Sequence, residues 1–296
     1  MARTVLITGC SDGGLGAALA IAFYKNGDRV IATARNPAKM ASLKAMGIET
    51  LQLDVLSEDS IKTAVQATSQ LTNNSLDILV NNAGQGYSTP LLDASISEVS
   101  KLFEINTLSA LRMSQLFFPL LRNAKDGALL VNNTSCAGIM PVPLQGPYSA
   151  TKAALASLSE VLRQELQPFN IKVIDLKTGA VRSNFFANAS SSGGSSEGSL
   201  TLPEDSLYLP GKEPVEKFMR TDINITEMPA DEWATKVVRD LSKRHPPIHV
   251  WRGGNALQVW LCSFLPVGTL DAVLKKMTGL DVVERYYRGS KAQKTK

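Results

Sequence analysis

Three side chains near the middle of the sequence have the types and spacing of an acid-base centre. Ser135 is followed after thirteen residues by Tyr148, and Lys152 lies four residues further on. A phenol titrates near pH ~10, so it exchanges protons at neutral pH only when a nearby cation stabilises the phenolate. Lys152 can supply that cation, and Ser135 can donate a hydrogen bond to a substrate oxygen. The three groups therefore predict proton transfer at an alcohol or a carbonyl.

The tyrosine-to-lysine spacing alone does not identify this centre, because two other pairs share it. Tyr208 and Lys212 form one pair, and Tyr287 and Lys291 form the other. A Leu-Pro-Gly sequence after Tyr208 stops a helix, and Ser195, thirteen residues before it, belongs to a serine-glycine run. Tyr287 has a leucine, not a serine, at that upstream position. We therefore interpret both pairs as chance matches.

The segments around Tyr148 predict elements that bring the three groups together. Residues 149–166 carry leucines at helical spacing, after a proline suited to the first turn of a helix. Tyr148 and Lys152 therefore share one helix face. Residues 128–133, ALLVNN, have the pattern of a buried strand. Ser135 thus follows the carboxyl end of a strand, where open α/β sheets bind their ligands.

Reduction of a carbonyl also needs a hydride, which no side chain carries, so a cofactor site must exist elsewhere. A short apolar strand, residues 4–8, runs into a glycine-rich turn and then into a helical stretch. Glycines let the backbone approach a pyrophosphate, and the helix amino terminus offers free N–H groups to it. The candidate residues in this turn are Gly9, Ser11, Asp12, Gly14, Leu15 and Gly16. The alternative is a tight turn that binds nothing.

Arg35 bears on which cofactor is used. It follows the second predicted strand, residues 29–34, and no acidic residue stands at the tip of that strand. An acidic residue there would bind the hydroxyls of an adenosine ribose, whereas an arginine suits a 2′-phosphate. The sequence therefore predicts NADPH rather than NADH. The alternative is a surface arginine that caps the sheet edge.

The third and fourth predicted strands, residues 49–53 and 77–80, end in polar residues at the same sheet edge. Asp54 can meet the adenine amino group, or it can cap the helix that begins near Ser57. The turn after the fourth strand can brace the sheet through side-chain hydrogen bonds and let a cofactor pass closely. The candidate residues at these two ends are Asp54, Val55, Asn82, Ala83 and Gly84.

Asn106 lies in a long predicted helix, residues 95–121, on a face that is otherwise largely apolar. A buried asparagine needs hydrogen-bond partners. One interpretation is a capped or kinked helical turn, and the other is a water-holding relay to Lys152.

Length and composition favour one large α/β domain, residues 1–252, followed by an extension, residues 253–296. The chain of 296 residues is 44% apolar and has a net charge of only +4, which gives nucleic-acid binding no support. Three well-separated cysteines are typical of a reducing compartment, and two histidines give a zinc site no support. The amino terminus runs directly into VLITG, so we expect no cleaved leader.

The motifs taken together resemble those of the short-chain dehydrogenase/reductase family of the non-extended type. They are TGCSDGGLG, NNAG at residues 81–84, Asn106, Ser135 and YSATK at residues 148–152. The resemblance implies a Rossmann-type, doubly wound parallel sheet of about seven strands, a nicotinamide cofactor, and homodimers or homotetramers. It also implies roles for individual residues. The implied catalytic tetrad is Asn106, Ser135, Tyr148 and Lys152; further cofactor contacts are Tyr148, Lys152, Gly179, Val181 and Ser183; the substrate pocket is Gln85, Cys136, Ile139, Phe185 and Phe186.

Two departures from the family pattern concern turns at the cofactor site. The glycine loop is one residue longer than usual, if its final pair is Gly14 and Gly16. After the sixth predicted strand, the family's usual Pro-Gly pair reads Thr178-Gly179. We therefore expect altered phosphate contacts and a turn beside the nicotinamide that lacks its rigid residue.

The last third of the chain predicts a lid and a carboxyl-terminal helical extension. The segment 183–230 contains a serine-glycine run and aromatic and leucine residues that suit an apolar substrate. The alternative is an insertion without a catalytic role. In the extension, five apolar residues fall on one helix face ahead of a basic tail: Leu257, Trp260, Leu261, Phe264 and Leu265. This pattern is typical of a membrane-surface helix, and equally of a core or dimer contact.

A narrower resemblance covers residues 228–241 and 250–266, which are similar to fungal NADPH-dependent 1-acyldihydroxyacetone-phosphate reductases. It implies the cytoplasmic side of the endoplasmic reticulum or a lipid-droplet surface, and it leaves the substrate open, because fungal members of the family also include ketoreductases of secondary metabolism. The first hypothesis is therefore an NADPH-dependent reductase of an apolar ketone, with that acyl-ketone phosphate as first candidate. The alternatives are a ketoreductase or dehydrogenase of a polyketide, terpenoid or steroid-like substrate, and a non-catalytic NADPH-binding scaffold. Cations that could meet a phosphate are Arg182, Lys212, Lys217 and Arg220.

Overall fold

The computed structural model describes residues 2–183, 200–220 and 226–294, with the side chains of 291–294 left aside. Its centre is a sheet of seven parallel strands in the order β3-β2-β1-β4-β5-β6-β7. The strands are β1 Thr4–Ile7, β2 Arg29–Ala34, β3 Glu49–Gln52, β4 Ile78–Asn81, β5 Ala128–Asn133, β6 Ile171–Thr178 and β7 His249–Arg252. The predicted seven-stranded, doubly wound sheet is confirmed.

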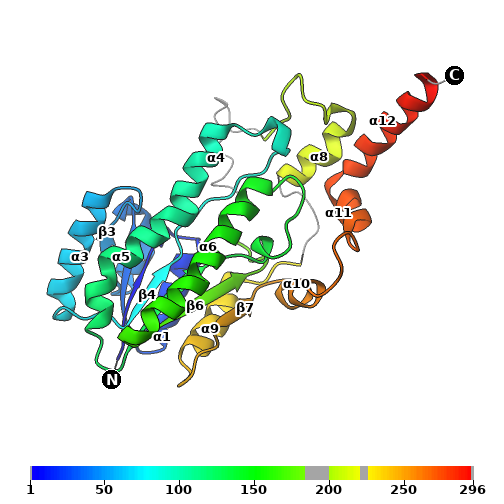
Figure 1. The fold of residues 1–296 in the computed structure, drawn as a ribbon. Helices are drawn as coiled ribbons and strands as arrows, with labels where there is room; N and C mark the ends of the chain where they lie inside the picture. The colour runs from blue at the N-terminus through cyan, green and yellow to red at the C-terminus, as the bar shows by residue number, and fades with distance from the viewer. Residues whose placement is uncertain (1, 184–199, 221–225, 295–296) are drawn as a thin grey trace.

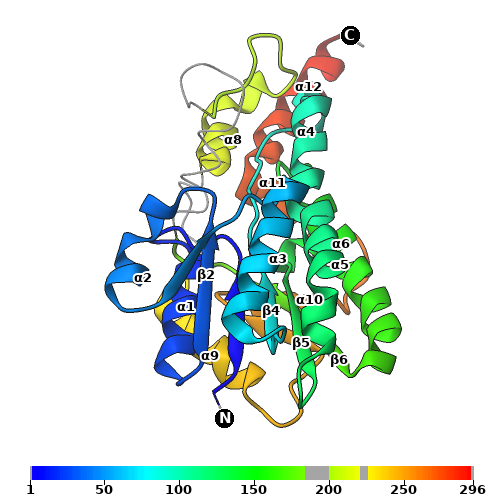
Figure 2. The ribbon, with the colours of Figure 1, turned by 90° about the vertical axis from the view of Figure 1, so that its left-hand side faces the viewer.

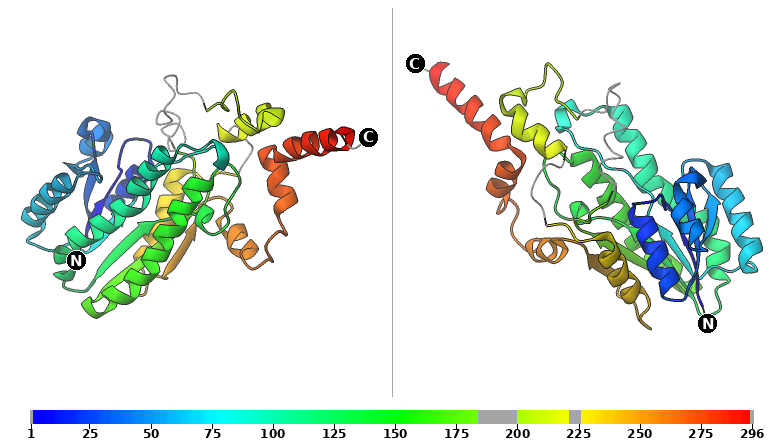
Figure 3. Two further views of the ribbon diagram at one scale, coloured as in Figure 1. Left: turned by 45° about the horizontal axis from the view of Figure 1, so that its top comes forward. Right: turned by 180° about the vertical axis from the view of Figure 1, so that it is seen from behind.

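Helices cover both faces of this sheet (Figures 1 and 3). The helices of the main body are α1 Leu15–Lys25, α2 Ala41–Ala45, α3 Glu58–Thr72, α4 Ile96–Phe103, α5 Ser109–Arg122, α6 Gly146–Leu166 and α9 Ala230–Leu241. Alternate strand residues point to opposite faces, so β1 sends Val5 and Ile7 to the core under α1 and α9 and Leu6 to the core under α3 and α5. Short apolar runs buried on both faces are what a parallel sheet requires.

The remaining helices lie beyond the carboxyl ends of the strands. They are α8 Lys212–Met219, α10 Ala256–Cys262, α11 Asp271–Thr278 and α12 Leu280–Lys294. Figure 2 shows α8, α11 and α12 above the sheet, at the end opposite the amino terminus. Val215, Phe218 and Met219 of α8 and Val283 of α12 form a small apolar cluster together with Leu144 and Leu202. The α8, α11 and α12 group therefore stands on the side of the sheet where ligands bind.

The long helix predicted over residues 95–121 is interrupted. Ser95 caps α4, and one π-helical turn, Glu104–Leu108, separates α4 from α5. A π-turn inserts one extra residue and is frequently found at functional sites. The sequence pattern does not reveal this break. Asn106 and Thr107 stay buried in the π-turn, so the buried face of the helix continues through it.

Candidate active site

Helix α6 carries Tyr148 and Lys152 on the same face. Pro147 lies in the first turn of the helix, where its missing N–H costs no hydrogen bond. Lys152 is buried, and its Nζ donates a hydrogen bond of 2.8 Å to the Asn133 carbonyl at the end of β5. The same Nζ lies 5.9 Å from the centroid of the Tyr148 ring. The lysine charge is therefore held between the end of the strand and the phenol.

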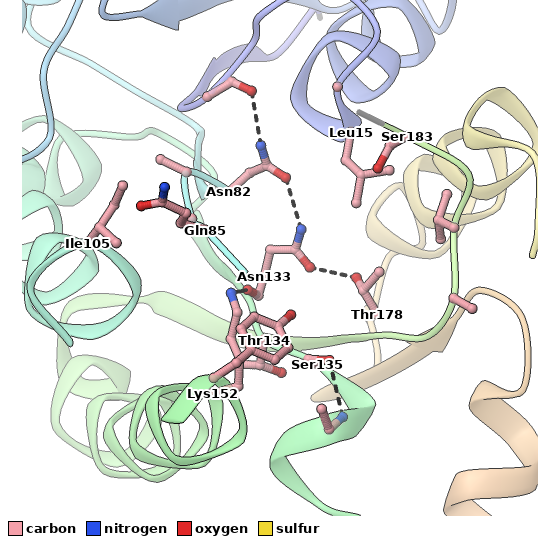
Figure 4. Close-up of a pocket in the computed structure, with 18 of the residues that line it drawn as sticks. Leu15, Asn82, Gln85, Ile105, Asn133, Thr134, Ser135, Lys152, Thr178 and Ser183 are labelled. Carbon is pink, nitrogen blue, oxygen red and sulfur yellow. Dashed lines mark hydrogen bonds between the residues drawn. The ribbon is translucent and has the colours of Figure 1, made fainter. Parts of the chain in front are cut away.

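Ser135 reaches the same point from β5 (Figure 4). It begins the 3-10 turn Cys136–Gly138, and its Oγ accepts a hydrogen bond of 3.1 Å from the Ala137 N–H. It is also hydrogen-bonded to Tyr148. The structure thus brings together the three groups that the spacing singled out.

Burial shifts the pKa values of the acid-base pair in opposite directions. It raises the pKa of Tyr148 to about 12, against the hydrogen bond from Ser135, which lowers it. It lowers the pKa of Lys152 to about 8, against the Asp175 carboxylate, which raises it. Tyr148 is therefore a neutral phenol at pH 7. Desolvation is the largest influence on the Tyr148 pKa, and the effect of Lys152 in making this phenol more acidic stays a prediction.

Asn106 braces the neighbouring turn from within the π-turn. Its Nδ2 donates to the Gln85 carbonyl at 2.9 Å and to Thr151 Oγ1 at 3.0 Å, and its Oδ1 accepts from the Gln85 N–H at 2.8 Å. A Cβ on Gly84 would lie 3.0 Å from Asn106 Oδ1 and 3.5 Å from Lys152 Nζ. The buried asparagine therefore has its partners, and it lies in a π-helical turn. The interpretation as a capped or kinked turn stays a prediction. A water relay to Lys152 stays a prediction.

A chain of hydrogen bonds links the ends of four neighbouring strands, β1, β4, β5 and β6 (Figure 4). Asn133 Nδ2 donates to Asn82 Oδ1 at 2.9 Å, and Thr178 Oγ1 donates to Asn133 Oδ1 at 2.6 Å. Asn82 Nδ2 in turn donates to the Thr8 carbonyl at 2.8 Å. Thr178, which stands where the family has proline, therefore holds its turn by a buried hydrogen bond instead of by a ring.

The glycine loop packs tightly against the turn after β4. Gly9 has a positive φ of 74°, and a Cβ there would lie 2.9 Å from the Ala83 Cα. A Cβ on Gly16, inside the first turn of α1, would lie 2.4 Å from the Gly9 carbonyl oxygen. Gly14 is the residue that caps α1. The amino terminus of α1 is thus open to a ligand, as phosphate binding requires.

Two cations stand beyond the end of β2. Arg35 and Lys39 are both exposed and both line the cavity described below. Lys39 belongs to the 3-10 turn Pro37–Met40, and its carbonyl accepts a hydrogen bond of 2.7 Å from the Asp12 N–H of the glycine loop. Lys39 was not predicted, because the sequence does not reveal that this turn folds back on the glycine loop.

Asp54 does not cap the helix that follows it. Ser57 caps α3 by accepting from the Ser60 N–H at 3.2 Å, while Asp54 Oδ1 accepts from the Leu56 N–H at 3.0 Å in a local turn. The capping alternative is therefore wrong. Asp54 and Val55 line the cavity beside the end of β3.

All these groups surround one cavity of about 1050 Å³, large for a small-molecule site. Of the predicted site residues it is lined by Gly9, Ser11, Asp12, Gly14, Leu15, Arg35, Asp54, Val55, Asn82, Ala83, Gly84, Gln85, Ser135, Cys136, Tyr148, Lys152, Gly179, Val181 and Ser183. Gly16 and Asn106 support the wall from behind. Ile139 does not line the cavity and is exposed, because it follows the 3-10 turn that carries Ser135. Phe185 and Phe186 lie outside the described residues.

Further residues that were not predicted also line the cavity, some beside predicted residues and others from segments distant in the sequence. They are Ala34, Asn36, Lys39, Leu53, Ile105, Asn133, Thr134, Ala137, Met140, Val142, Gln145, Thr178, Ala180, Phe218, Gly254, Asn255, Val259 and Met277. Asn133 and Thr178 had a signal, since both end buried strands at the same edge. The chance pairs lie elsewhere: Tyr208 packs in the α8 cluster, and Tyr287 Oη donates to the Leu207 carbonyl at 3.0 Å.

Among the described residues, no group of acidic, histidine or cysteine side chains could hold a metal ion, and no helix is long and apolar enough to cross a membrane. The five residues of the carboxyl-terminal stripe are partly or largely exposed, with Phe264 at 72% and Leu257 at 63%. The interpretation of this stripe as part of the chain's own core is therefore wrong.

Comparisons with known proteins agree with this geometry. The family model described as short chain dehydrogenase matches residues 3–193. The chain is 46% identical over 287 residues to the short-chain dehydrogenase/reductase GME11361 of Pestalotiopsis microspora, covering 97% of both chains. It is 40% identical over 227 residues to the NADPH-dependent 1-acyldihydroxyacetone phosphate reductase of Schizosaccharomyces pombe, covering 73% of this chain and 74% of that one.

A solved short-chain dehydrogenase from Streptomyces avermitilis superposes with a TM-score of 0.72 at 29% identity, covering 96% of this chain and 98% of the other. The matched region contains the glycine loop, the strand ends and the serine, tyrosine and lysine of the site. The chain therefore belongs to the short-chain dehydrogenase/reductase family, whose members are oxidoreductases acting on CH–OH and C=O groups.

Proposed function

We propose that the chain is an NADPH-dependent oxidoreductase that reduces a ketone, or oxidises the corresponding secondary alcohol, of an apolar substrate. The observation that carries the proposal is the convergence of Ser135, Tyr148 and Lys152 on the cavity into which the amino terminus of α1 also opens. The cavity is large enough for a dinucleotide together with a substrate.

The cavity residues fit an NADPH molecule. The glycine loop and the free N–H groups of α1 would hold the pyrophosphate, since a side chain on Gly9 would collide with Ala83. Arg35 and Lys39 would bind the 2′-phosphate. Asp54 and Val55 would border the adenine; Asn82, Ala83, Gly84, Gly179, Val181 and Ser183 would border the nicotinamide half. The name of the S. pombe relative states NADPH dependence for that enzyme. When bound, NADPH supplies the hydride.

The side chains would stabilise the carbonyl oxygen of the substrate and donate a proton to it. Ser135 and Tyr148 donate hydrogen bonds to the carbonyl oxygen as negative charge develops on it. Tyr148 then gives up its phenolic proton, which it carries at neutral pH because burial raises its pKa to about 12. The Lys152 cation stabilises the phenolate that remains, and its bond to the Asn133 carbonyl keeps it in place. Asn106 fixes the turn at Gln85 beside them.

Two substrate classes remain candidates. A 1-acyldihydroxyacetone phosphate is favoured by the similarity to the S. pombe reductase. A polyketide, terpenoid or steroid-like ketone is the other, and the apolar lining of the cavity by Met140, Val142 and Phe218 favours it. A non-catalytic scaffold would not need the serine, tyrosine and lysine gathered at one cavity.

The exposed apolar residues of α10 and the segment after it are proposed to bind a lipid surface peripherally. No charged residue occurs between 253 and 270, and basic residues such as Lys276 follow. Apolar residues beside cations are typical of contact with anionic lipid. The cytoplasmic face of the endoplasmic reticulum or a lipid droplet would offer such a surface. A homodimer or homotetramer through the helices near residues 95–122 and 147–168 is the partner that the family resemblance implies.

A panel of lipid and polycyclic ketones tests the proposal, with NADPH and NADH compared as reductants. The expected result is oxidation of NADPH by at least one ketone, with NADH the poorer reductant. Tight NADPH binding without turnover on any ketone would refute the enzymatic proposal and favour the scaffold.

A further inference from the structure

The end of the cavity beyond Ser135 is built by helices that lie beyond the carboxyl ends of the strands. Phe218 comes from α8, Val259 from α10 and Met277 from α11, and they line the cavity together with Met140 and Val142. Resting on the proposed function, we propose that this wall selects an uncharged, apolar ketone and discriminates against a phosphate-bearing one. The carboxyl-terminal extension is then part of the substrate site.

The wall is fixed in place next to the catalytic serine. Ala256 and Val259 of α10 pack in one cluster with Cys136, the residue after Ser135, and with Met140. Helix α10 therefore lies against the 3-10 turn that Ser135 begins, and Val259 lines the cavity beside the position proposed for the substrate carbonyl.

The residues that follow Met277 hold the end of α11 against α8. Thr278, its neighbour, is fully buried, and its Oγ1 donates to the Leu274 carbonyl at 2.8 Å. At Gly279 a Cβ would lie 2.7 Å from Pro214 of α8, so α11 and α8 are in close contact. Met277 itself is 37% exposed, which places it at the mouth of the cavity.

The distribution of charge supports an uncharged substrate. The cations that line the described part of the cavity are Arg35, Lys39 and Lys152. Arg35 and Lys39 stand beyond the end of β2, and Lys152 is buried at the catalytic centre. The wall residues Met140, Val142, Phe218, Val259 and Met277 carry no charge. A phosphate dianion placed against them would lose water without gaining a counter-ion.

The cations that could have met a phosphate are placed elsewhere. Lys212 and Arg220 both lie near the buried Glu216 carboxylate, at 3.9 and 3.4 Å, and Arg182 lies 3.8 Å from Glu227. Neither these three nor Lys217 lines the cavity. The stretches 184–199 and 221–225, outside the described residues, contain no lysine or arginine in their sequence.

A matched pair of ketones tests this inference on the full chain. They are 1-acyldihydroxyacetone and 1-acyldihydroxyacetone phosphate of the same acyl length, which differ only by the phosphate. We expect kcat/KM with NADPH to be at least about tenfold higher for the uncharged ketone. A preference for the phosphate would overturn the inference and leave the proposed function intact. Failure of both ketones and of the wider panel would overturn the proposed function, and the inference with it.

A charge placed on the wall tests the role of α11 separately. Met277→Lys should raise the ratio of kcat/KM for the phosphate to that for the uncharged ketone by about tenfold, because it supplies the missing counter-ion. Ala272→Lys is the matched control, since Ala272 is exposed on the same helix and does not line the cavity. Its ratio should stay within about twofold of the unsubstituted chain. Equal ratios for the two variants would show that α11 does not select the substrate.

Discussion

The charge of Lys152 makes cofactor binding at the site depend on pH. The Lys152 pKa is lowered to about 8, so this lysine is charged below that pH and neutral above it. Since the charged form is the one that can bind the hydroxyls and the negative charge of a cofactor, affinity for NADPH should fall as pH rises through about 8. We expect a loss of about tenfold between roughly pH 7 and pH 9, measured by titration calorimetry.

Tyr148→Phe is the control for that titration. It removes a phenol whose pKa of about 12 lies far above the pH range of the titration. The NADPH affinity of this variant should therefore fall near the same pH as that of the unsubstituted chain. Lys152→Met should remove this dependence of NADPH affinity on pH. An affinity of the unsubstituted chain that is constant over this range would refute the assignment to Lys152.

Thr178 should matter for stability through its bond to Asn133. Thr178→Val keeps the shape of the side chain but leaves the buried Asn133 Oδ1 without its donor at 2.6 Å. We expect the free energy of unfolding in urea to fall by about 1–3 kcal/mol. Thr178→Ser retains the hydroxyl and serves as the control. Equal stability of the valine and serine variants would contradict the account of this turn.

At the residue scale, the sequence predicted which side chains form the site better than it predicted their pKa values. Residue type and spacing were sufficient for Ser135, Tyr148 and Lys152, because their roles depend on a strand end and one helix face. The pKa values depend on how deeply the folded chain buries each group, and no local pattern encodes that burial. For the same reason, the sequence showed that Thr178 replaces the family's proline, but it did not show the hydrogen bond from Thr178 to Asn133.

Among the elements, the end of β2 is proposed to set the preference between cofactors. Arg35→Ala and Lys39→Ala should each weaken NADPH binding by about tenfold or more and leave NADH binding within about twofold, because each removes one charge from the 2′-phosphate. Binding is measured by titration with each cofactor. Lys25→Ala is the control, since Lys25 is exposed at the end of α1 and outside the cavity. An equal loss for both cofactors would contradict the assignment.

The order and type of the strands could be predicted because each is a short apolar run followed by a polar turn. The π-turn at Glu104–Leu108 could not, since its apolar residues continue the helical pattern on both sides. Its cause is a tertiary contact: Asn106 binds Gln85 and Thr151, which lie 21 and 45 residues away. Lys39 escaped prediction for a similar reason, because its turn is held by the glycine loop.

For the whole molecule, the α10 surface predicts peripheral binding to lipid. Leu261→Ser with Phe264→Ser should lower the fraction of protein that floats with anionic vesicles severalfold, because both side chains are exposed and apolar. Leu56→Ser with Leu71→Ser is the control, since these exposed leucines lie beside β3, at the opposite edge of the sheet from β7 and α10. If both double variants float like the unsubstituted chain, the membrane proposal is wrong, and a contact between copies becomes the explanation of the stripe.

The position of the extension is the part of the molecule that the sequence predicted least. Its helices were visible as patterns, but their contacts with α8 and with the turn after Ser135 join segments about 65 to 125 residues apart in the chain. Hydrophobic spacing indicates that one face of a helix is apolar, but it does not indicate which element packs against that face. Val259 and Met277 could therefore be assigned to the cavity only from the folded chain.

The most direct test of the central claim follows a hydride from cofactor to product. NADPH carrying deuterium at the transferred position of the nicotinamide is incubated with the best ketone of the panel, and the alcohol is analysed by mass spectrometry. We predict one deuterium on the carbinol carbon, and a kcat at least about a hundredfold lower for Tyr148→Phe with unchanged NADPH binding. An alcohol without deuterium, or a Tyr148→Phe variant that turns over normally, would contradict the claim that this tyrosine and the dinucleotide act on the same carbonyl.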